Sequence, residues 1–305
     1  RSKTHEQIAK KIVNEIDPKI FVCISSEVSS RFREYERFIT TAWNARVAPD
    51  SGIYLERIVK KIKTMWPNIS LTMMTSNGGL EEVQTNQKNN LDGKLDIKQL
   101  PIRLALSGPA AAGNAIVKVS NDLKIPNLVG MDVGGTSSDI VVIRGGRLNE
   151  SPMEDREIGG YPLQTPMLDL NTIGAGGGSL VYIDEYGALH VGPQSAGADP
   201  GPACYNRGGK LPTVTDAAVI IGRMPRRIKL GGTLSIFPNM SEKVFKSNFS
   251  HSKREIHSLA FDILSLAESQ IALAIRERTV SRGINPKEMS LVAAGGAGPL
   301  LACGV

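Results

Sequence analysis

The residues from Asp132 to Asp139 have the types and the spacing that phosphate chemistry requires. The run reads Asp-Val-Gly-Gly-Thr-Ser-Ser-Asp and lies between two stretches rich in valine, isoleucine and leucine. This pattern predicts a β-hairpin in which the glycine pair forms the tight turn. A tip made of Gly134, Gly135 and Thr136 would expose consecutive backbone N–H groups, and such main-chain donors can cradle a phosphate.

The two aspartates of this run are the candidate catalytic residues. Asp132 ends the incoming predicted strand, where its carboxylate could hold a hydrated Mg²⁺ against the same phosphate. Asp139 begins the outgoing strand and could orient a water molecule or the loop, or be purely structural. An ordinary glycine hairpin without a ligand is the alternative for the whole run.

A second glycine-rich segment, 171–179, is a candidate cofactor-binding loop. Its spacing does not fit the dinucleotide motif G-x-G-x-x-G, because Ser179 stands where that motif requires glycine. A Walker A motif is also excluded, because Leu211 follows Gly209-Lys210. We favour a second backbone nest for a ligand over a plain flexible loop, with these candidate residues: Gly174, Gly176, Gly177, Gly178 and Ser179.

A third glycine-rich turn follows a predicted strand at 290–294. Gly295, Gly296 and Gly298 would let a flat ligand such as adenine lie against bare backbone. The motif is weak alone. Together with the hairpin tip it would provide a base end and a phosphate end for one nucleotide.

The segment 192–205 contains three prolines and three glycines and is expected to be a rigid irregular loop. Cys204 lies within it and has no histidine near it in the sequence, so we expect a buried structural thiol rather than a nucleophile. The other cysteines, Cys23 and Cys303, are far away. This usage excludes a disulfide framework and a thiolate zinc site and is typical of the reducing cytoplasm.

The composition is that of an ordinary globular protein, with 41% hydrophobic and 22% charged residues. Aromatic residues make up only 5% whereas glycine occurs 31 times, which favours close backbone approach to a ligand over stacking on nucleic acid. The net charge of +6 comes from scattered basic residues, so no nucleic-acid partner is expected. No apolar run approaches the ~18 residues that span a bilayer, and no membrane association is expected.

The elements that must position these motifs alternate between helix and strand, which predicts an α/β fold. A capping box at Thr4–Gln7 predicts the first helix. Periodicity and glycine or proline signals then predict strands at 20–24 and 68–75, and helices at 33–45, 52–66, from Ser107 onward, and at 255–283.

Four segments in this order resemble the hydantoinase A / 5-oxoprolinase family: Asp132–Thr136, Ile173–Ser179, Gly192–Tyr205 and Gly295–Pro299. Shorter pieces match it as well, namely Ser25–Val28, Arg33–Arg37, Ser76–Gly79 and Ser107–Pro109. The similarity covers nearly the whole chain, and the 192–205 loop is highly specific.

That family is similar to the actin-like ATPases, in which two α/β domains of ribonuclease H-like fold, with mixed sheets flanked by helices, clasp ATP. The resemblance implies that 1–106 is the remainder of a first domain and 107–305 is the second. It implies ATP and Mg²⁺ as cofactors, a second-domain phosphate loop at Asp132–Asp139 and an adenosine motif at Gly295–Gly298. An earlier domain with the first phosphate loop would lie upstream of Arg1, so the chain alone is expected to be nearly inactive.

Members of the family hydrolyse cyclic amides such as 5-oxoproline and hydantoins with consumption of ATP, commonly with a hydantoinase B-type partner subunit. An amide oxygen is a poor leaving group until it is phosphorylated, and phosphoryl transfer needs positioning and charge neutralisation above all. The expected function is therefore an ATP-dependent cyclic amide hydrolase in the cytoplasm. The alternatives are the ATP-handling subunit of an acetone-type carboxylase and a non-catalytic ATP-gated clamp. Asn171 stands where members of the family often have histidine. A metal or substrate role of that histidine is therefore not carried over to Asn171.

Overall fold

The computed structural model describes residues 3–83, 100–225, 229–252 and 254–305. The chain divides into two compact units, of which unit 1 comprises 1–115 and 149–169, and unit 2 comprises 116–148 and 170–305. The division thus falls inside helix α4 (Ser107–Leu123) rather than at 106/107. The segment 149–169 belongs to unit 1, where the N–H of Leu168 donates to Ser76 O at 2.9 Å.

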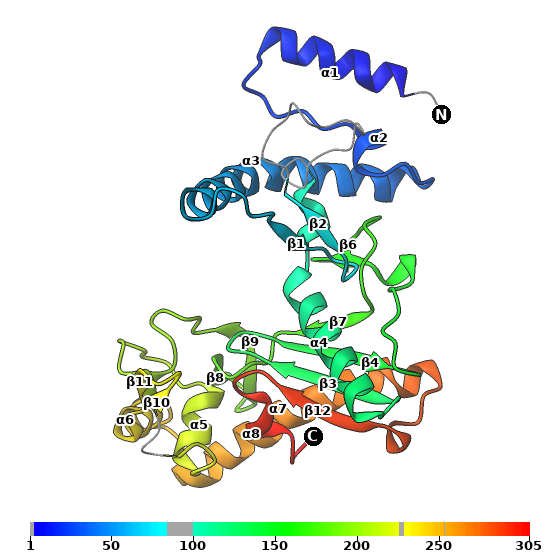
Figure 1. Ribbon diagram of the computed structural model, residues 1–305. Helices are drawn as coiled ribbons and strands as arrows, with labels where there is room; N and C mark the ends of the chain where they lie inside the picture. The colour runs from blue at the N-terminus through cyan, green and yellow to red at the C-terminus, as the bar shows by residue number, and fades with distance from the viewer. Residues whose placement is uncertain (1–2, 84–99, 226–228, 253) are drawn as a thin grey trace. The chain divides into compact units, whose positions relative to one another are not determined.

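Unit 1 is mainly helical. Its long helix α3 (Glu34–Met65) packs against the 3-10 turn η2 (Pro101–Leu104) (Figure 1). Leu55 and Val59 of α3 share an apolar cluster with Met73 of β1 (Thr72–Met74), which forms a hairpin with β2 (Leu80–Glu82). The remaining elements are α1 (Thr4–Ile16), α2 (Ser25–Val28) and the short pair β5 (Glu157–Ile158) and β6 (Tyr161–Pro162).

Three predictions for unit 1 are wrong in detail. The two helices expected at 33–45 and 52–66 form one helix that continues through Pro49, whose missing N–H removes only one ladder bond. The segment 20–24 is not a strand, and Ile20 is exposed. The first helix begins at Thr4 itself, after Lys3 and without a side-chain cap, so the predicted capping box is not formed. The expected surface loop at 84–99 lies outside the described residues.

Unit 2 is built on a four-stranded mixed sheet in the order β12-β3-β4-β7, which confirms the predicted α/β fold with a mixed sheet flanked by helices. Strands β3 (Leu128–Val133), β4 (Ser138–Ile143) and β7 (Leu170–Ile173) form an antiparallel meander, and β12 (Ser290–Ala294) lies parallel to β3. The predicted hairpin around Gly134-Gly135 is confirmed.

Helices cover both faces of this sheet. Helix α7 (Ile256–Arg278) packs against the face that carries Met131, Val133 and Ile140, whereas Ile116 of α4 packs with Leu128 and the β4 residues of the other face. Within the described residues, the stretch 256–282 is the only helical segment long and apolar enough to cross a membrane. Half of its most apolar window is buried in the protein, and we interpret α7 as the central core helix.

The other elements of unit 2 lie to one side of the sheet, on its left in Figure 1. They are the hairpin of β8 (Ser179–Ile183) and β9 (Leu189–Ser195), the helices α5 (Val214–Ile220), α6 (Pro238–Asn248) and α8 (Gly298–Leu301), and the short pair β10 (Lys229–Leu230) and β11 (Leu234–Ser235).

Asp216 of α5 fixes the predicted irregular loop 192–205. Its fully buried carboxylate accepts hydrogen bonds from the N–H groups of Ala203 (3.1 Å) and Cys204 (2.8 Å) and from the Ser241 hydroxyl (2.7 Å). It also closes a capping box with Thr213. Burial, and next the charge of Asp216, raise the pKa of the Cys204 thiol far above its ordinary value, so this thiol is structural, as expected.

We predict that Asp216→Ala is strongly destabilising. The substitution leaves several buried donors without an acceptor, so the free energy of unfolding should fall by about 3–5 kcal/mol, as measured by urea denaturation. Asp199→Ala removes an exposed carboxylate from the same loop and serves as the control. A loss below ~1 kcal/mol for Asp216→Ala would contradict this role.

Candidate functional site

Two aspartates face each other where the β3–β4 hairpin approaches its tip. Asp132 is directly opposite Asp139 in the antiparallel register, and Thr172 of β7 is opposite Asp139 in turn. Like charges in directly opposite positions of neighbouring strands are destabilising. A carboxylate pair held in this way is typical of a functional site.

The environment of Asp139 changes its proton affinity. Burial raises the pKa of the Asp139 carboxyl above its ordinary value, and the charge of Asp132 raises it further. The Thr172 hydroxyl donates to Asp139 Oδ1 at 2.6 Å and partly opposes this rise. Asp139 is therefore better suited to hold a proton than an exposed aspartate. The sequence pattern predicted only an orienting or a structural role for Asp139 and did not indicate this raised pKa.

The tip of the hairpin presents backbone donors to open space. The N–H of Gly134 donates to Ser137 O at 2.9 Å and closes the turn. Gly135 and Thr136 are exposed, and within the described part of the chain their N–H groups have no acceptor. A Cβ atom on Gly135 would meet no other atom within 4 Å. The tip therefore fits the phosphate cradle predicted for it.

The loop 174–178 supports the hairpin tip from behind. Gly176, Gly177 and Gly178 are buried. The N–H of Gly177 donates to Gly134 O at 2.9 Å, and the N–H of Gly178 donates to Gly135 O at 2.6 Å. These N–H groups, predicted to bind a ligand, are thus engaged within the chain.

Glycine is required in this loop because two backbones approach each other closely. A Cβ atom on Gly176 would lie 2.8 Å from both Thr136 C and Ser137 N, closer than real Cβ contacts allow. The N–H of Gly176 donates to Ser179 Oγ at 2.8 Å, and this hydroxyl donates to Gly174 O at 3.3 Å. We therefore assign the loop a supporting role at the phosphate cradle.

The turn after β12 reaches the same place through the parallel pairing of β12 with β3. Ala294 lies opposite Asp132, and Gly295 follows with φ 77°. A Cβ atom on Gly295 would lie 2.4 Å from Asp132 Oδ1, so only glycine leaves room for that carboxylate. The N–H of Ala297 donates to Val133 O at 3.0 Å. The other two candidates of this turn differ, since Gly296 is exposed with open space at its Cβ position and Gly298 is buried.

Thr215 of α5 joins the site, although the sequence pattern did not single it out. Its N–H and its hydroxyl both donate to Gly177 O, at 2.7 and 2.8 Å. A signal was available in the run Thr213-Val-Thr-Asp216, which has the form of a helix cap. The cap places Thr215 in the first turn of α5, beside the glycine loop.

Asn171 lies on the other face of the sheet. It pairs with Ile140, one position away from the pair of Asp139 and Thr172, so its side chain is on the opposite side of β7. There its Nδ2 donates to Glu277 Oε2 of α7 at 3.5 Å. Asn171 is therefore separated from the aspartate pair.

The aspartate pair is suited to a magnesium ion that keeps other ligands. No group of three or more histidine, cysteine, aspartate or glutamate side chains gathers anywhere in the described ranges. Mg²⁺ bound to a nucleotide needs only one or two carboxylates, because phosphate oxygens and water complete its octahedron. Asp132 and Asp139, beside an exposed nest of N–H donors, fit that requirement.

We predict that Gly176→Ala disturbs the hairpin tip and destabilises unit 2. The added methyl group must displace the backbone of Thr136 and Ser137, which should lower the free energy of unfolding by about 1–3 kcal/mol in urea denaturation. Gly135→Ala is the matched control, because its methyl group points into open space and its φ lies outside the left-handed region. Equal stability of the two variants would contradict the supporting role of the loop.

We also predict that Asp139→Asn stabilises the protein at neutral pH. With a raised pKa, the folded state binds the Asp139 proton more tightly than the unfolded chain does, so ionisation costs stability as the pH rises through this pKa. Asn removes this charge, and Tm at pH 7 should rise by an amount equivalent to about 0.5 kcal/mol. The gain should vanish below about pH 4, where the native carboxyl is protonated. Asp122→Asn, an exposed carboxylate paired with Lys118, should give no such gain.

The sequence is similar to those of several characterised proteins. It is 35% identical to caprolactamase subunit alpha of Pseudomonas jessenii, over 97% of this chain and 41% of that protein. It is 31% identical to 5-oxoprolinase PfmaA of Pestalotiopsis fici, over 99% of this chain and 23% of that protein. It is 30% identical to the acetophenone carboxylase gamma subunit of Aromatoleum aromaticum, over 97% of this chain and 39% of that protein. The chain thus spans less than half the length of these relatives.

Two solved structures are similar to this fold. One is the nucleotide-free structure of an acetone carboxylase, described as part of the mechanism of ATP-dependent acetone carboxylation, with a TM-score of 0.85 at 23% identity; the match covers 99% of this chain and 41% of that one. The other is the ATP-dependent caprolactamase from Pseudomonas jessenii, with a TM-score of 0.74 at 34% identity, over 99% of this chain and 42% of that one. The fold is thus the ATPase-like α/β fold that the resemblance implied.

The family model for hydantoinase/oxoprolinase proteins matches residues 37–305, which include the hairpin, the glycine loop and the turn after β12. The chain therefore belongs to the hydantoinase/oxoprolinase family.

Proposed function

We propose that this chain is the nucleotide-handling part of an ATP-dependent enzyme that opens a cyclic amide. The observation that carries the proposal is the meeting of three glycine segments around Asp132. The exposed N–H groups of the hairpin tip face open space, the glycine loop supports them, and Gly295 makes room for the carboxylate. Backbone donors beside a metal-binding carboxylate suit the charge of a phosphoryl group in transfer.

ATP would supply a phosphoryl group to the amide oxygen, with ADP as the leaving group, and so activate the amide carbon toward water. Cleavage of the ring C–N bond would then open the ring, with the nitrogen leaving as an amine and the phosphate released by hydrolysis. The residues of this chain would do the positioning. The N–H groups of Gly135 and Thr136 would bind phosphate oxygens, and Asp132 would hold Mg²⁺ against them. Asp139, with its raised pKa, would hold or release a proton at its carboxyl group. The turn at Gly295–Gly298 would accept the adenosine end.

The relatives support a cyclic amide as substrate, because two of them are named for opening one, a caprolactamase and a 5-oxoprolinase. We propose a lactam or hydantoin as the substrate and a hydantoinase B-type partner subunit, since the caprolactamase relative is itself a subunit. We further propose a cytoplasmic location, in accord with the free cysteines Cys23, Cys204 and Cys303. The 305 residues alone should be nearly inactive, because such sites use phosphate contacts from two domains.

A carboxylase subunit is the second candidate. It is supported by the 30% identity with the acetophenone carboxylase gamma subunit over 97% of this chain. The two functions are separated by assaying ATP turnover of the full-length protein with its partner subunit. Stimulation by 5-oxoproline, a hydantoin or caprolactam supports the hydrolase. Stimulation by a ketone that depends on bicarbonate supports the carboxylase, and no stimulation by either class would overturn both.

We predict that Asp132→Asn removes magnesium-dependent ATP turnover in the full-length enzyme. Loss of the carboxylate should lower kcat by at least about 100-fold, a loss typical of removing one group that stabilises the transition state. Nucleotide binding without Mg²⁺ should persist, because the backbone donors are untouched, and isothermal titration calorimetry measures this. Asp122→Asn serves as the control. Turnover within twofold of the native rate would refute the role of Asp132.

A further inference from the structure

Unit 1 contains a polar cavity that the proposed function does not use. The cavity has a volume of about 320 Å³ and lies between the β1–β2 turn, the segment after α2, and residues 164–166. This volume is at the lower end of the range for small-ligand sites. All of its lining residues belong to unit 1.

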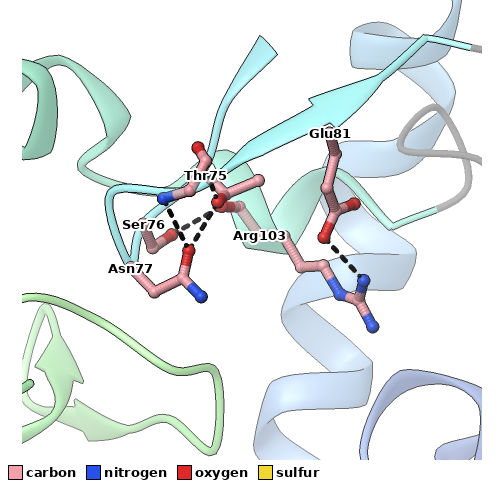
Figure 2. A network of polar contacts seen from close by, with 6 residues as sticks. Thr75, Ser76, Asn77, Glu81 and Arg103 are labelled. Atoms are coloured by element: carbon pink, nitrogen blue, oxygen red, sulfur yellow. Dashed lines mark hydrogen bonds and ion pairs between the residues drawn. The ribbon is translucent and has the colours of Figure 1, made fainter. Parts of the chain in front are cut away.

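The turn between β1 and β2 holds Asn77 in one orientation. Asn77 Oδ1 accepts hydrogen bonds from the Thr75 hydroxyl at 2.6 Å and from the N–H of Gly79 at 3.0 Å. With its oxygen fixed in this way, the side-chain amide must present its Nδ2 group outward. Figure 2 shows the nitrogen of Asn77 directed away from Thr75, toward the same side of the turn as the Arg103 guanidinium.

The positive charge at the cavity is only partly compensated. Arg103 Nη1 forms an ion pair with Glu81 Oε1 at 2.9 Å, which leaves its other N–H groups available (Figure 2). Arg31 also lines the cavity, and its guanidinium has no acceptor among the residues that the structure describes. Its charge also contributes to lowering the pKa of Arg156, after the larger effect of burial. The charged side chains that line the cavity are thus two guanidinium groups, of Arg31 and Arg103, and one carboxylate, of Glu81, which leaves one positive charge uncompensated.

Among the buried polar side chains that line the cavity, Thr165 keeps unused hydrogen-bonding capacity. Gln164 is 2% exposed and fully engaged, because its Oε1 accepts the Ser29 hydroxyl at 2.8 Å and its Nε2 donates to the carbonyl oxygens of Phe32 and Arg33. Thr165 is 5% exposed, yet in the described parts of the chain its hydroxyl has no hydrogen-bond partner. The hydroxyl oxygen itself is not fully buried, so it is open to the cavity and can bond to a ligand. The cavity thus offers donors and a surplus positive charge.

We propose that this cavity binds a small organic molecule through a carboxylate group. The planar Arg103 guanidinium and the planar Asn77 amide can each donate to a carboxylate, which is planar and carries a single charge. That single charge would balance the surplus cation at the cavity. The inference does not depend on the proposed function, because it uses only residues of unit 1.

The test compares two ligands of the same shape, the anionic cyclopentanecarboxylate and the neutral cyclopentanecarboxamide, in which an NH₂ group replaces one carboxylate oxygen. Neither contains a cyclic amide, so neither reports on amide opening. The ¹H–¹⁵N spectrum of the full chain is followed during titration at neutral pH. We expect the carboxylate to shift the Asn77 side-chain amide signals with a Kd of about 1 mM, as few contacts offset the cost of association. The carboxamide should bind at least tenfold more weakly.

The variant Asn77→Asp separates binding from folding. Aspartate keeps the Oδ1 acceptor for Thr75 and Gly79, so the turn and Tm should be retained, but it replaces the donating amide with a second acceptor oxygen. Carboxylate binding should weaken at least tenfold. Arg57→Gln removes an exposed charge of α3 that does not line the cavity and should change Kd by less than twofold.

Three results with these two ligands and the Asn77→Asp variant would overturn the proposal. They are equal affinity for carboxylate and carboxamide, unchanged carboxylate binding by Asn77→Asp, and no shift of the Asn77 amide at 50 mM carboxylate. Inorganic phosphate is titrated in parallel. Binding of phosphate at least tenfold tighter than the carboxylate would assign the cavity to a phosphate ligand and would also overturn the proposal.

Discussion

The close approach of two backbones, the glycine loop 176–178 against the tip of the β3–β4 hairpin, is the constraint on which the rest of the site depends. No Cβ atom fits at Gly176, and the N–H groups of Gly177 and Gly178 hold the carbonyls of the turn. These carbonyl contacts orient the turn so that the N–H groups of its tip face outward. A phosphate cradle made of backbone is rigid only if something behind it prevents the turn from relaxing.

The support behind this contact extends into the core of unit 2. Gly177 O accepts two hydrogen bonds from Thr215, at the start of α5. Asp216, the next residue, holds both the helix cap and the backbone at 203–204. Helix α5 packs in turn against the long core helix α7. A continuous set of buried hydrogen bonds and apolar contacts thus connects the exposed tip with the part of the unit that is hardest to deform.

The aspartate pair carries a local cost that the surrounding structure offsets. Asp132 and Asp139 lie on one face of the sheet, beyond the apolar residues that pack under α4, and Gly295 leaves space for the Asp132 carboxylate. Like charges on directly opposite residues favour a cation between or beside them, and a bound metal would offset this repulsion. The stability cost and the proposed chemistry therefore have the same origin.

The sequence by itself determined the hairpin, the α/β class and the family. Local signals sufficed there, because a glycine pair between β-branched runs specifies a tight turn, and the apolar period of α7 specifies a core helix. Tertiary structure decided what each glycine is for. Gly135 and Gly176 look alike in the sequence, yet one faces open space and the other has backbone atoms at 2.8 Å. The difference arises from contacts between segments about forty residues apart, and no local pattern records such contacts.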